Sequence, residues 1–139
     1  MSDTAATTAA PTKAKNTFAA VGIGVSDMAR SVEFYTNVMG MKQMQTFDLP
    51  HMKEVVLGYK GDVAVVLMHY IDGSVHNYAD NPVKLVFNID DPMALAARFH
   101  AAGLEVTREP EPLAEFGGVI VGLAKDPDGY VIEMLKQPS

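Results

Sequence analysis

The chain has 139 residues, of which 48% are hydrophobic and 20% are charged, as in an ordinary soluble globular domain. Its net charge of −6 argues against nucleic acid and anionic membranes as partners, and the absence of cysteine excludes disulfides, thiolate nucleophiles and cysteine-ligated metals. The longest apolar run, Val63 to Met68, is too short to span a bilayer.

The first fifteen residues, 1–15, are rich in alanine and threonine and contain no apolar core. This composition predicts a disordered arm and does not fit a secretory signal. A cytoplasmic location is therefore expected. A folded domain is expected over 16–137.

An alternating strand is predicted at 18–25, with small residues such as Ala20, Gly22 and Gly24 on one face. Small side chains on one face either allow another stretch of backbone to approach closely or leave room for a ligand. A helix is predicted at 28–39, since a cap precedes it and an apolar stripe follows helical spacing. Further predicted elements of this half are strands at 41–47, 52–57 and 63–69, and then a polar connection at 72–82.

The second half repeats this plan. A strand is predicted at 83–89, and Asp90 or Asp91 then caps a helix that ends at Gly103. The strands that follow are predicted at 104–108, 118–124 and 130–136. Both halves therefore predict one strand, one helix and three strands. This repeat indicates an internal duplication with modules at about 16–81 and 82–137.

The turn Asp126-Pro127-Asp128-Gly129 introduces the last strand. Alternation along that strand places the carboxylate of Glu133 in the middle of an otherwise apolar segment. A plain hairpin whose glutamate reaches solvent is the alternative interpretation.

Two segments carry a family resemblance. Val25 to Met41 resembles the "D…S..FY...LGM" motif near the start of vicinal oxygen chelate superfamily domains. Asp126 to Glu133 resembles the "DPDGy.iEl" motif near their end. That superfamily includes glyoxalase I, methylmalonyl-CoA epimerase, fosfomycin and bleomycin resistance proteins, and extradiol dioxygenases. The resemblance covers nearly all of 17–136 and is strongest to bacterial glyoxalase I. It implies an α+β fold of two βαβββ modules that form an eight-stranded cup, completed across a homodimer.

The resemblance also implies where a metal would be held. The four ligand positions of glyoxalase I fall on Ala20, Val66, Lys84 and Glu133, and only the last of these is a metal ligand. We therefore expect no metal and no cofactor. A metal-dependent glyoxalase-like lyase with non-standard ligands stays as an alternative, with the following candidates: His51, His69 and His76.

The predicted cup face is mostly small or apolar, as in many small-molecule sites. The expected ligand-binding residues on its strands are Ala20, Gly22, Val66, Met68, Tyr70 and Asn88. His76 and Tyr78 join them if the connection at 72–82 folds over the mouth of the cup; a solvated linker between modules is the alternative. The expected ligand is a small apolar or aromatic molecule.

Lys84 and Glu133 are expected on neighbouring strands of the cup, where they form an ion pair. The first functional hypothesis is a metal-free lyase, isomerase or epimerase, with Glu133 as the base and Lys84 stabilising an enolate. The second is a non-catalytic protein that sequesters or carries its ligand, of the bleomycin-resistance type. A degenerate paralogue kept for interaction is a third possibility.

Overall fold

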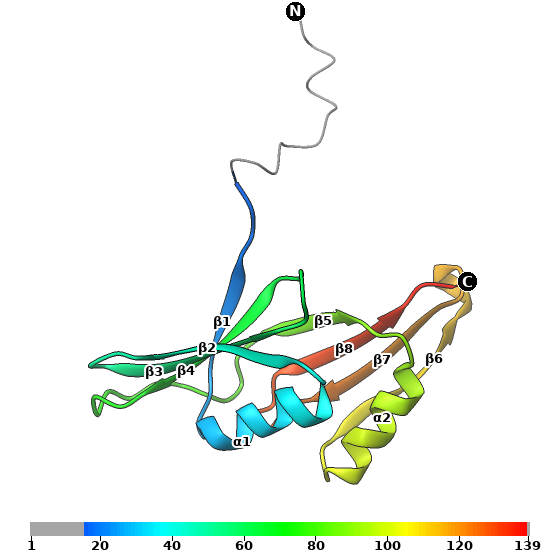
Figure 1. Ribbon diagram of the computed structural model, residues 1–139. Helices are drawn as coiled ribbons and strands as arrows, with labels where there is room; N and C mark the ends of the chain where they lie inside the picture. The colour runs from blue at the N-terminus through cyan, green and yellow to red at the C-terminus, as the bar shows by residue number, and fades with distance from the viewer. Residues whose placement is uncertain (1–15, 139) are drawn as a thin grey trace, which may run out of the picture.

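The computed structural model describes residues 16–138, so the arm expected at 1–15 lies outside the described residues. Two four-stranded sheets form the framework, with strand orders β1-β4-β3-β2 and β5-β8-β7-β6 (Figure 1). The strands of the first sheet are β1 (Ala20–Gly24), β2 (Lys42–Asp48), β3 (Met52–Gly58) and β4 (Ala64–Tyr70). Those of the second are β5 (Lys84–Asn88), β6 (Val106–Leu113), β7 (Val119–Lys125) and β8 (Val131–Lys136).

The two sheets have the same topology. In each, the first strand pairs in parallel with the last, β1 with β4 and β5 with β8, and the remaining pairs are antiparallel. A helix follows the first strand in each half. The predicted α+β fold of two βαβββ modules is therefore confirmed.

The first helix is shorter than predicted. Helix α1 (Met28–Glu33) is capped by Asp27, whose side chain accepts a hydrogen bond from the Arg30 backbone N–H. It continues as a π-helical turn, η2 (Phe34–Val38), so the single α-helix expected at 28–39 is wrong in its second half. A π turn is wider than an α turn, and here it accompanies the burial of two adjacent aromatic residues, Phe34 and Tyr35.

The strand predicted at 104–108 is also corrected, because β6 runs from Val106 to Leu113 and includes two prolines. This strand lies at the edge of its sheet, where a missing backbone donor is tolerated. Pro110 packs against the neighbouring strand β7 at Gly122, which has no side chain. A Cβ added at Gly122 would lie 2.7 Å from Pro110 Cγ. The short helix η3 (Ala114–Phe116) then leads into β7.

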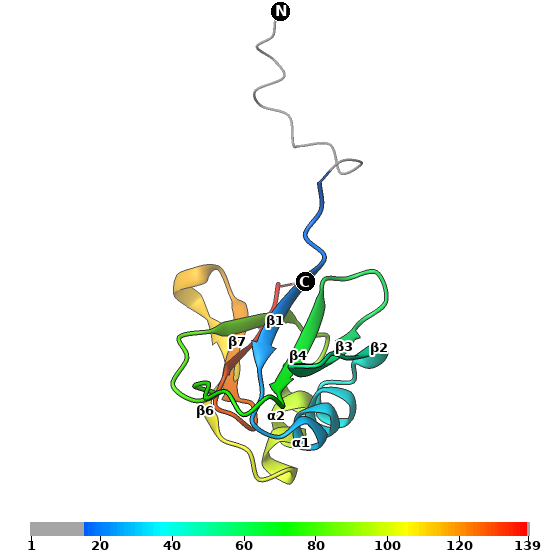
Figure 2. The ribbon, with the colours of Figure 1, turned by 90° about the vertical axis from the view of Figure 1, so that its left-hand side faces the viewer.

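Helices α1 and α2 (Pro92–Ala101) lie on the same side of the two sheets (Figures 1 and 2). The π turn η2 after α1 meets α2 through Phe34 and Phe99, whose rings pack edge to face with centroids 5.3 Å apart. Buried residues of both modules form one continuous hydrophobic core. In the part of the chain that the structure describes, the opposite faces of both sheets carry no helix (Figures 1 and 2). Within residues 16–138, no helix has the length and apolar character needed to cross a membrane.

Candidate functional site

Two charged side chains meet on the helix-free face of the second sheet. Lys84 Nζ lies 2.8 Å from Glu133 Oε1, so the ion pair expected from the sequence is present. The Lys84 side chain is 53% exposed, whereas the Glu133 side chain is only 16% exposed. The carboxylate is therefore mostly withdrawn from water, and the ammonium group reaches it from the open side of the sheet.

Strand geometry explains this contact. β5 and β8 are parallel neighbours, with Val86 opposite Glu133 and Lys84 opposite Val131. Side chains at alternate positions share one face, so Lys84, Val86 and Glu133 project together away from the helices. Val86 is 52% exposed, which leaves an apolar surface beside the charged pair.

The four positions implied by the family resemblance do not fit a divalent metal. The side chains of Ala20 and Val66 have no atom that can coordinate a metal, and the ammonium group of Lys84 already binds the carboxylate of Glu133. His69 Nδ1 lies 2.8 Å from the Val25 carbonyl oxygen, on the helix side of its sheet. Among residues 16–138, no group of three or more His, Asp or Glu side chains is arranged to hold a metal ion.

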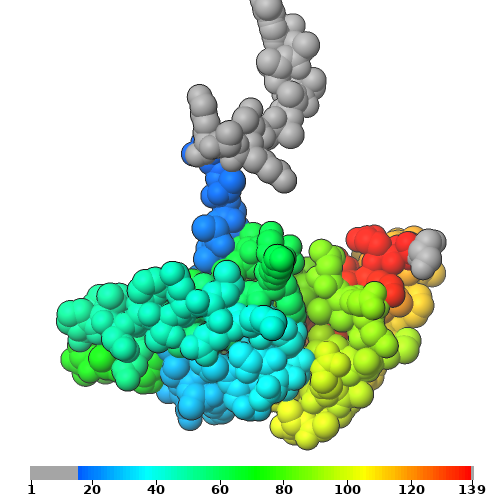
Figure 3. All heavy atoms as spheres, in the orientation of Figure 1, coloured from blue at the N-terminus to red at the C-terminus, as the bar shows by residue number. Residues whose placement is uncertain are grey.

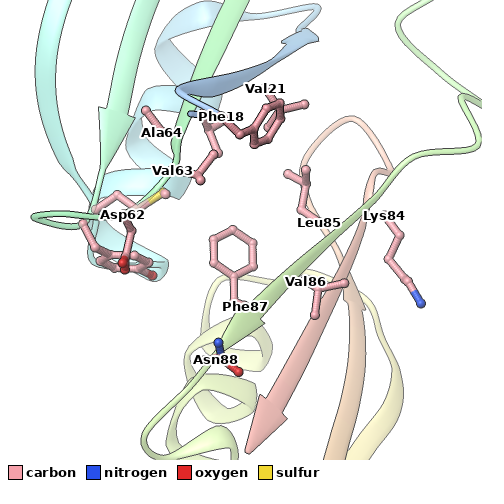
Figure 4. Close-up of a pocket in the computed structure, with 13 residues that line it drawn as sticks. Phe18, Val21, Asp62, Val63, Ala64, Lys84, Leu85, Val86, Phe87 and Asn88 are labelled. Carbon is pink, nitrogen blue, oxygen red and sulfur yellow. The ribbon is translucent and has the colours of Figure 1, made fainter. Parts of the chain in front are cut away.

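A hollow of about 490 Å³ lies between the two modules (Figure 4). Leu85 and Phe87 of β5 point into it toward Val63 of the first module, and Lys84 extends from the other face of β5. Asn88, expected to bind ligand, also lines this hollow. The lining is mixed, with Asp62, Lys84 and Asn88 as polar members, and the charged group of Lys84 points away from Leu85 and Phe87 (Figure 4).

The connection at 72–82 is mostly exposed to solvent, but Tyr78 and His76 contact the end of the first sheet. The Tyr78 hydroxyl accepts a hydrogen bond from the Tyr70 backbone N–H at 3.1 Å. The His76 ring stacks on the Tyr70 ring, with centroids 3.6 Å apart and an angle of 15° between the planes. Both expected residues of this connection thus reach the end of β4.

The small residues of β1 make room for neighbouring side chains. A Cβ added at Gly24 would lie 3.0 Å from Tyr78 Cδ1, and one added at Gly22 would lie 3.2 Å from Met68 Sδ. The groups that come close to these two glycines are side chains and not another backbone, and both glycines also line a pocket of about 310 Å³. A glycine at position 24 is what allows the Tyr78 ring to pack against β1.

The structure divides the expected site residues between the two sheets. The first sheet and its connection hold Ala20, Gly22, Val66, Met68, Tyr70, His76 and Tyr78. The second sheet holds Lys84, Asn88 and Glu133. Each set shares strand neighbours within its own sheet, but no strand pairing joins the two sheets.

The motif at 126–130 has a structural role that the sequence did not reveal. Asp126 Oδ2 accepts a hydrogen bond from the Tyr35 hydroxyl at 2.7 Å, which joins the second module to the first helix. Asp128 accepts hydrogen bonds from Ser26 N–H and from Arg30 Nη2, each at 3.0 Å. The two motifs that carried the family resemblance therefore bind each other and hold the modules together.

The electrostatics of this junction follow from its burial. Asp126 is only 3% exposed, and burial raises the pKa of its carboxyl group above the usual value. Burial, and then the nearby Asp126, raise the pKa of the Tyr35 hydroxyl well above its usual value. The tyrosine therefore stays protonated and donates to the carboxylate at neutral pH.

The chain is similar to known proteins over almost its full length. A family model described as Glyoxalase/Bleomycin resistance protein/Dioxygenase superfamily matches residues 17–134. A lactoylglutathione lyase of Haemophilus influenzae is 32% identical over 120 residues, which cover 83% of this chain and 88% of that protein. A lactoylglutathione lyase of Arabidopsis thaliana is 33% identical over 132 residues, but these cover 91% of this chain and 46% of the plant protein. The chain thus spans about half the length of that plant relative.

A solved structure shows the same fold. Glyoxalase I of Leishmania major superposes with a TM-score of 0.74 at 25% sequence identity, covering 88% of this chain and 87% of that one. The similarity therefore extends to the arrangement of both modules.

Proposed function

Since this chain belongs to the Glyoxalase/Bleomycin resistance protein/Dioxygenase superfamily, we propose that it is a metal-free lyase or isomerase that acts beside the carbonyl group of a small molecule. The observation that supports this is the contact between Lys84 and Glu133 on the helix-free face of the second sheet. A largely withdrawn carboxylate beside an accessible ammonium group provides a base and a cation within one site.

The proposed step needs only these two side chains. The carboxylate of Glu133 removes a proton from the carbon next to the carbonyl, and the ammonium group of Lys84 stabilises the negative oxygen of the resulting enolate. Return of the proton to a neighbouring atom gives an isomer, whereas loss of a substituent gives an elimination product. The relatives named lactoylglutathione lyase favour a substrate with a 2-hydroxyacyl or 2-oxo group.

A non-catalytic binding protein is the second candidate. It is favoured by the apolar character of the helix-free faces, where Val66, Met68 and Val86 accompany only a few polar groups. In that case the Lys84–Glu133 pair would only stabilise the fold, and a bound compound would be released without chemical change.

Substrate turnover and its response to a chelator distinguish these possibilities. A thermal-shift screen of 2-oxo, lactone and small aromatic compounds identifies a ligand, and NMR in D₂O then follows deuterium uptake beside its carbonyl group. We expect exchange that is undiminished by EDTA, in protein that elemental analysis finds to hold no stoichiometric transition metal. Loss of exchange on chelation would assign the reaction to a metal enzyme, and binding without exchange would favour the second candidate.

The working unit is proposed to be a homodimer, because one helix-free face forms only half of a cup. Apolar side chains are exposed on these faces and on β2, which lies at the surface of the first module (Figure 3). Val86 is 52% exposed, and Met44 and Phe47 of β2 are 57% and 41% exposed. A contiguous apolar patch on such a face would be typical of an interface between protein chains.

Sedimentation equilibrium at micromolar concentration should give twice the chain mass of 15.0 kDa. Val86→Asp should shift the protein toward monomer, since it places a charge on the face proposed to be covered. Met93→Asp is the matched control, because Met93 is 58% exposed but lies on helix α2, on the other side of the sheets. A wild-type monomer at this concentration would contradict the proposal.

A further inference from the structure

We infer that Tyr130 is a positioning residue, whose hydroxyl group fixes the two strands that bring Lys84 and Glu133 together. Tyr130 is only 4% exposed and stands directly before β8, on which Glu133 lies. It therefore acts on the charged pair through the strand. Its effect on turnover rests on the proposed function, whereas its effect on the contact between Lys84 and Glu133 does not.

Hydrogen bonds hold both the side chain and the backbone of Tyr130 in place. The hydroxyl donates to the Gly24 carbonyl oxygen of β1 at 2.6 Å, which ties the start of β8 to the first module. The backbone N–H donates to Asp126 Oδ1 at 2.9 Å, and the carbonyl oxygen accepts from the Asp126 N–H, also at 2.9 Å. Burial raises the pKa of the Tyr130 hydroxyl above its usual value, so the hydroxyl stays protonated and donates at neutral pH.

The same hydroxyl group reaches the segment that leads into β5. Asn81 Nδ2 donates to the Tyr130 hydroxyl oxygen at 3.4 Å, and the Asn81 carbonyl oxygen accepts from the Val83 N–H at 2.8 Å. The carbonyl oxygen of Val83 in turn accepts from the Val131 N–H at 3.3 Å. Lys84 follows Val83 directly, so the segments that lead into both strands of the ion pair are fixed around one hydroxyl group.

The ion pair depends on how these two strands are placed relative to each other. Lys84 lies opposite Val131 in the parallel ladder, so its side chain extends along β8 to bring Nζ within 2.8 Å of Glu133 Oε1. A shift at the start of either strand is carried along it to this contact. A displacement of about 1 Å at a reacting group can lower a rate about a hundredfold. Loss of the Tyr130 hydroxyl should therefore disturb the ion pair and the reaction proposed for it.

Tyr130→Phe tests the geometry in protein without substrate, because phenylalanine keeps the ring and removes only the hydroxyl group. The ¹³Cδ NMR signal of Glu133, assigned by its absence in Glu133→Gln, reports on the surroundings of the carboxylate. We expect Tyr130→Phe to move this signal toward its position in Lys84→Met, where the ammonium group is missing. Asn81→Ala should move it in the same direction by a smaller amount.

Steady-state kinetics on a confirmed substrate test the positioning role. Tyr130→Phe should lower kcat about tenfold with KM nearly unchanged, because the base is misplaced while the binding surface is kept. Tyr59→Phe is the matched control, since the Tyr59 hydroxyl also donates to a backbone carbonyl oxygen, that of Met39, but within the first module. This control should keep the wild-type kcat and the wild-type Glu133 signal. Urea unfolding checks that both variants are folded.

An unchanged Glu133 signal in Tyr130→Phe, or an equal change in Tyr59→Phe, would overturn the inference. Wild-type kcat in Tyr130→Phe, in an enzyme whose turnover is lost in Glu133→Gln, would also overturn it. The proposed reaction fails separately, because full turnover by Glu133→Gln ends that reaction but leaves the signal shift in Tyr130→Phe as support for the positioning of the ion pair.

Discussion

Glu133→Gln should reduce turnover on a confirmed substrate by about 10²–10⁴-fold, the usual contribution of a positioned acid–base group. Glutamine has nearly the same shape as glutamate and can still accept a hydrogen bond from the ammonium group of Lys84, so the fold should be kept. It cannot take up a proton, however, and the proposed abstraction step is lost. Steady-state kinetics should show the change in kcat, with KM nearly unaltered.

Two further variants separate chemistry from stability. Glu105→Gln is the matched control, since Glu105 is a 62% exposed glutamate of the same module and should keep full activity. Lys84→Met with Glu133→Leu removes both charges together and should be as stable as wild type within about 1–2 kcal/mol, because Lys84 is half exposed and its pairing is screened. Full turnover by Glu133→Gln would end the acid–base proposal and favour the binding protein.

The Lys84–Glu133 contact could be predicted because it follows from regular strand geometry. Alternation sets the face on which each side chain lies, and the repeat of strand, helix and three strands makes β5 and β8 neighbours. The cap of each helix was predicted to within two adjacent residues, and the structure identifies Asp27 and Asp91 as the caps. These features depend on local sequence together with one rule of topology.

Other features depend on contacts between distant parts of the chain. The bond between Tyr35 and Asp126 joins residues 91 positions apart, and local periodicity gives no sign of it. The packing of Tyr78 against Gly24 likewise needs the path of the whole connection, which its turn-rich composition leaves open. The extra length of β6 was missed because its prolines argue against a strand, except at a sheet edge.

Asp126→Ala should lower the free energy of unfolding by about 3–5 kcal/mol, because it leaves two buried donors and one part-buried donor without an acceptor. These are the Tyr35 hydroxyl at 2.7 Å and the backbone N–H groups of Asp128 and Tyr130, each at 2.9 Å. A domain of this size has a total stability of about 5–15 kcal/mol, so the loss should be large in urea unfolding. Asp90→Ala, at a fully exposed aspartate of the second module, is the control and should unfold at the wild-type midpoint.

Asp126→Asn tests the same junction through its pH dependence. Asparagine can still accept from both backbone N–H groups, and its amide can donate to the Tyr35 oxygen, so most of the stability should remain. Burial raises the pKa of Asp126 in the folded protein, so the folded state holds this proton more tightly than the unfolded chain does. The contribution of this group to wild-type stability therefore falls as pH rises from the ordinary carboxyl range of about 4 through the raised pKa. The asparagine variant has no such group, so its stability relative to wild type should increase between about pH 4 and pH 7. A relative stability that stays constant or decreases over this range would show that burial does not govern the titration of Asp126.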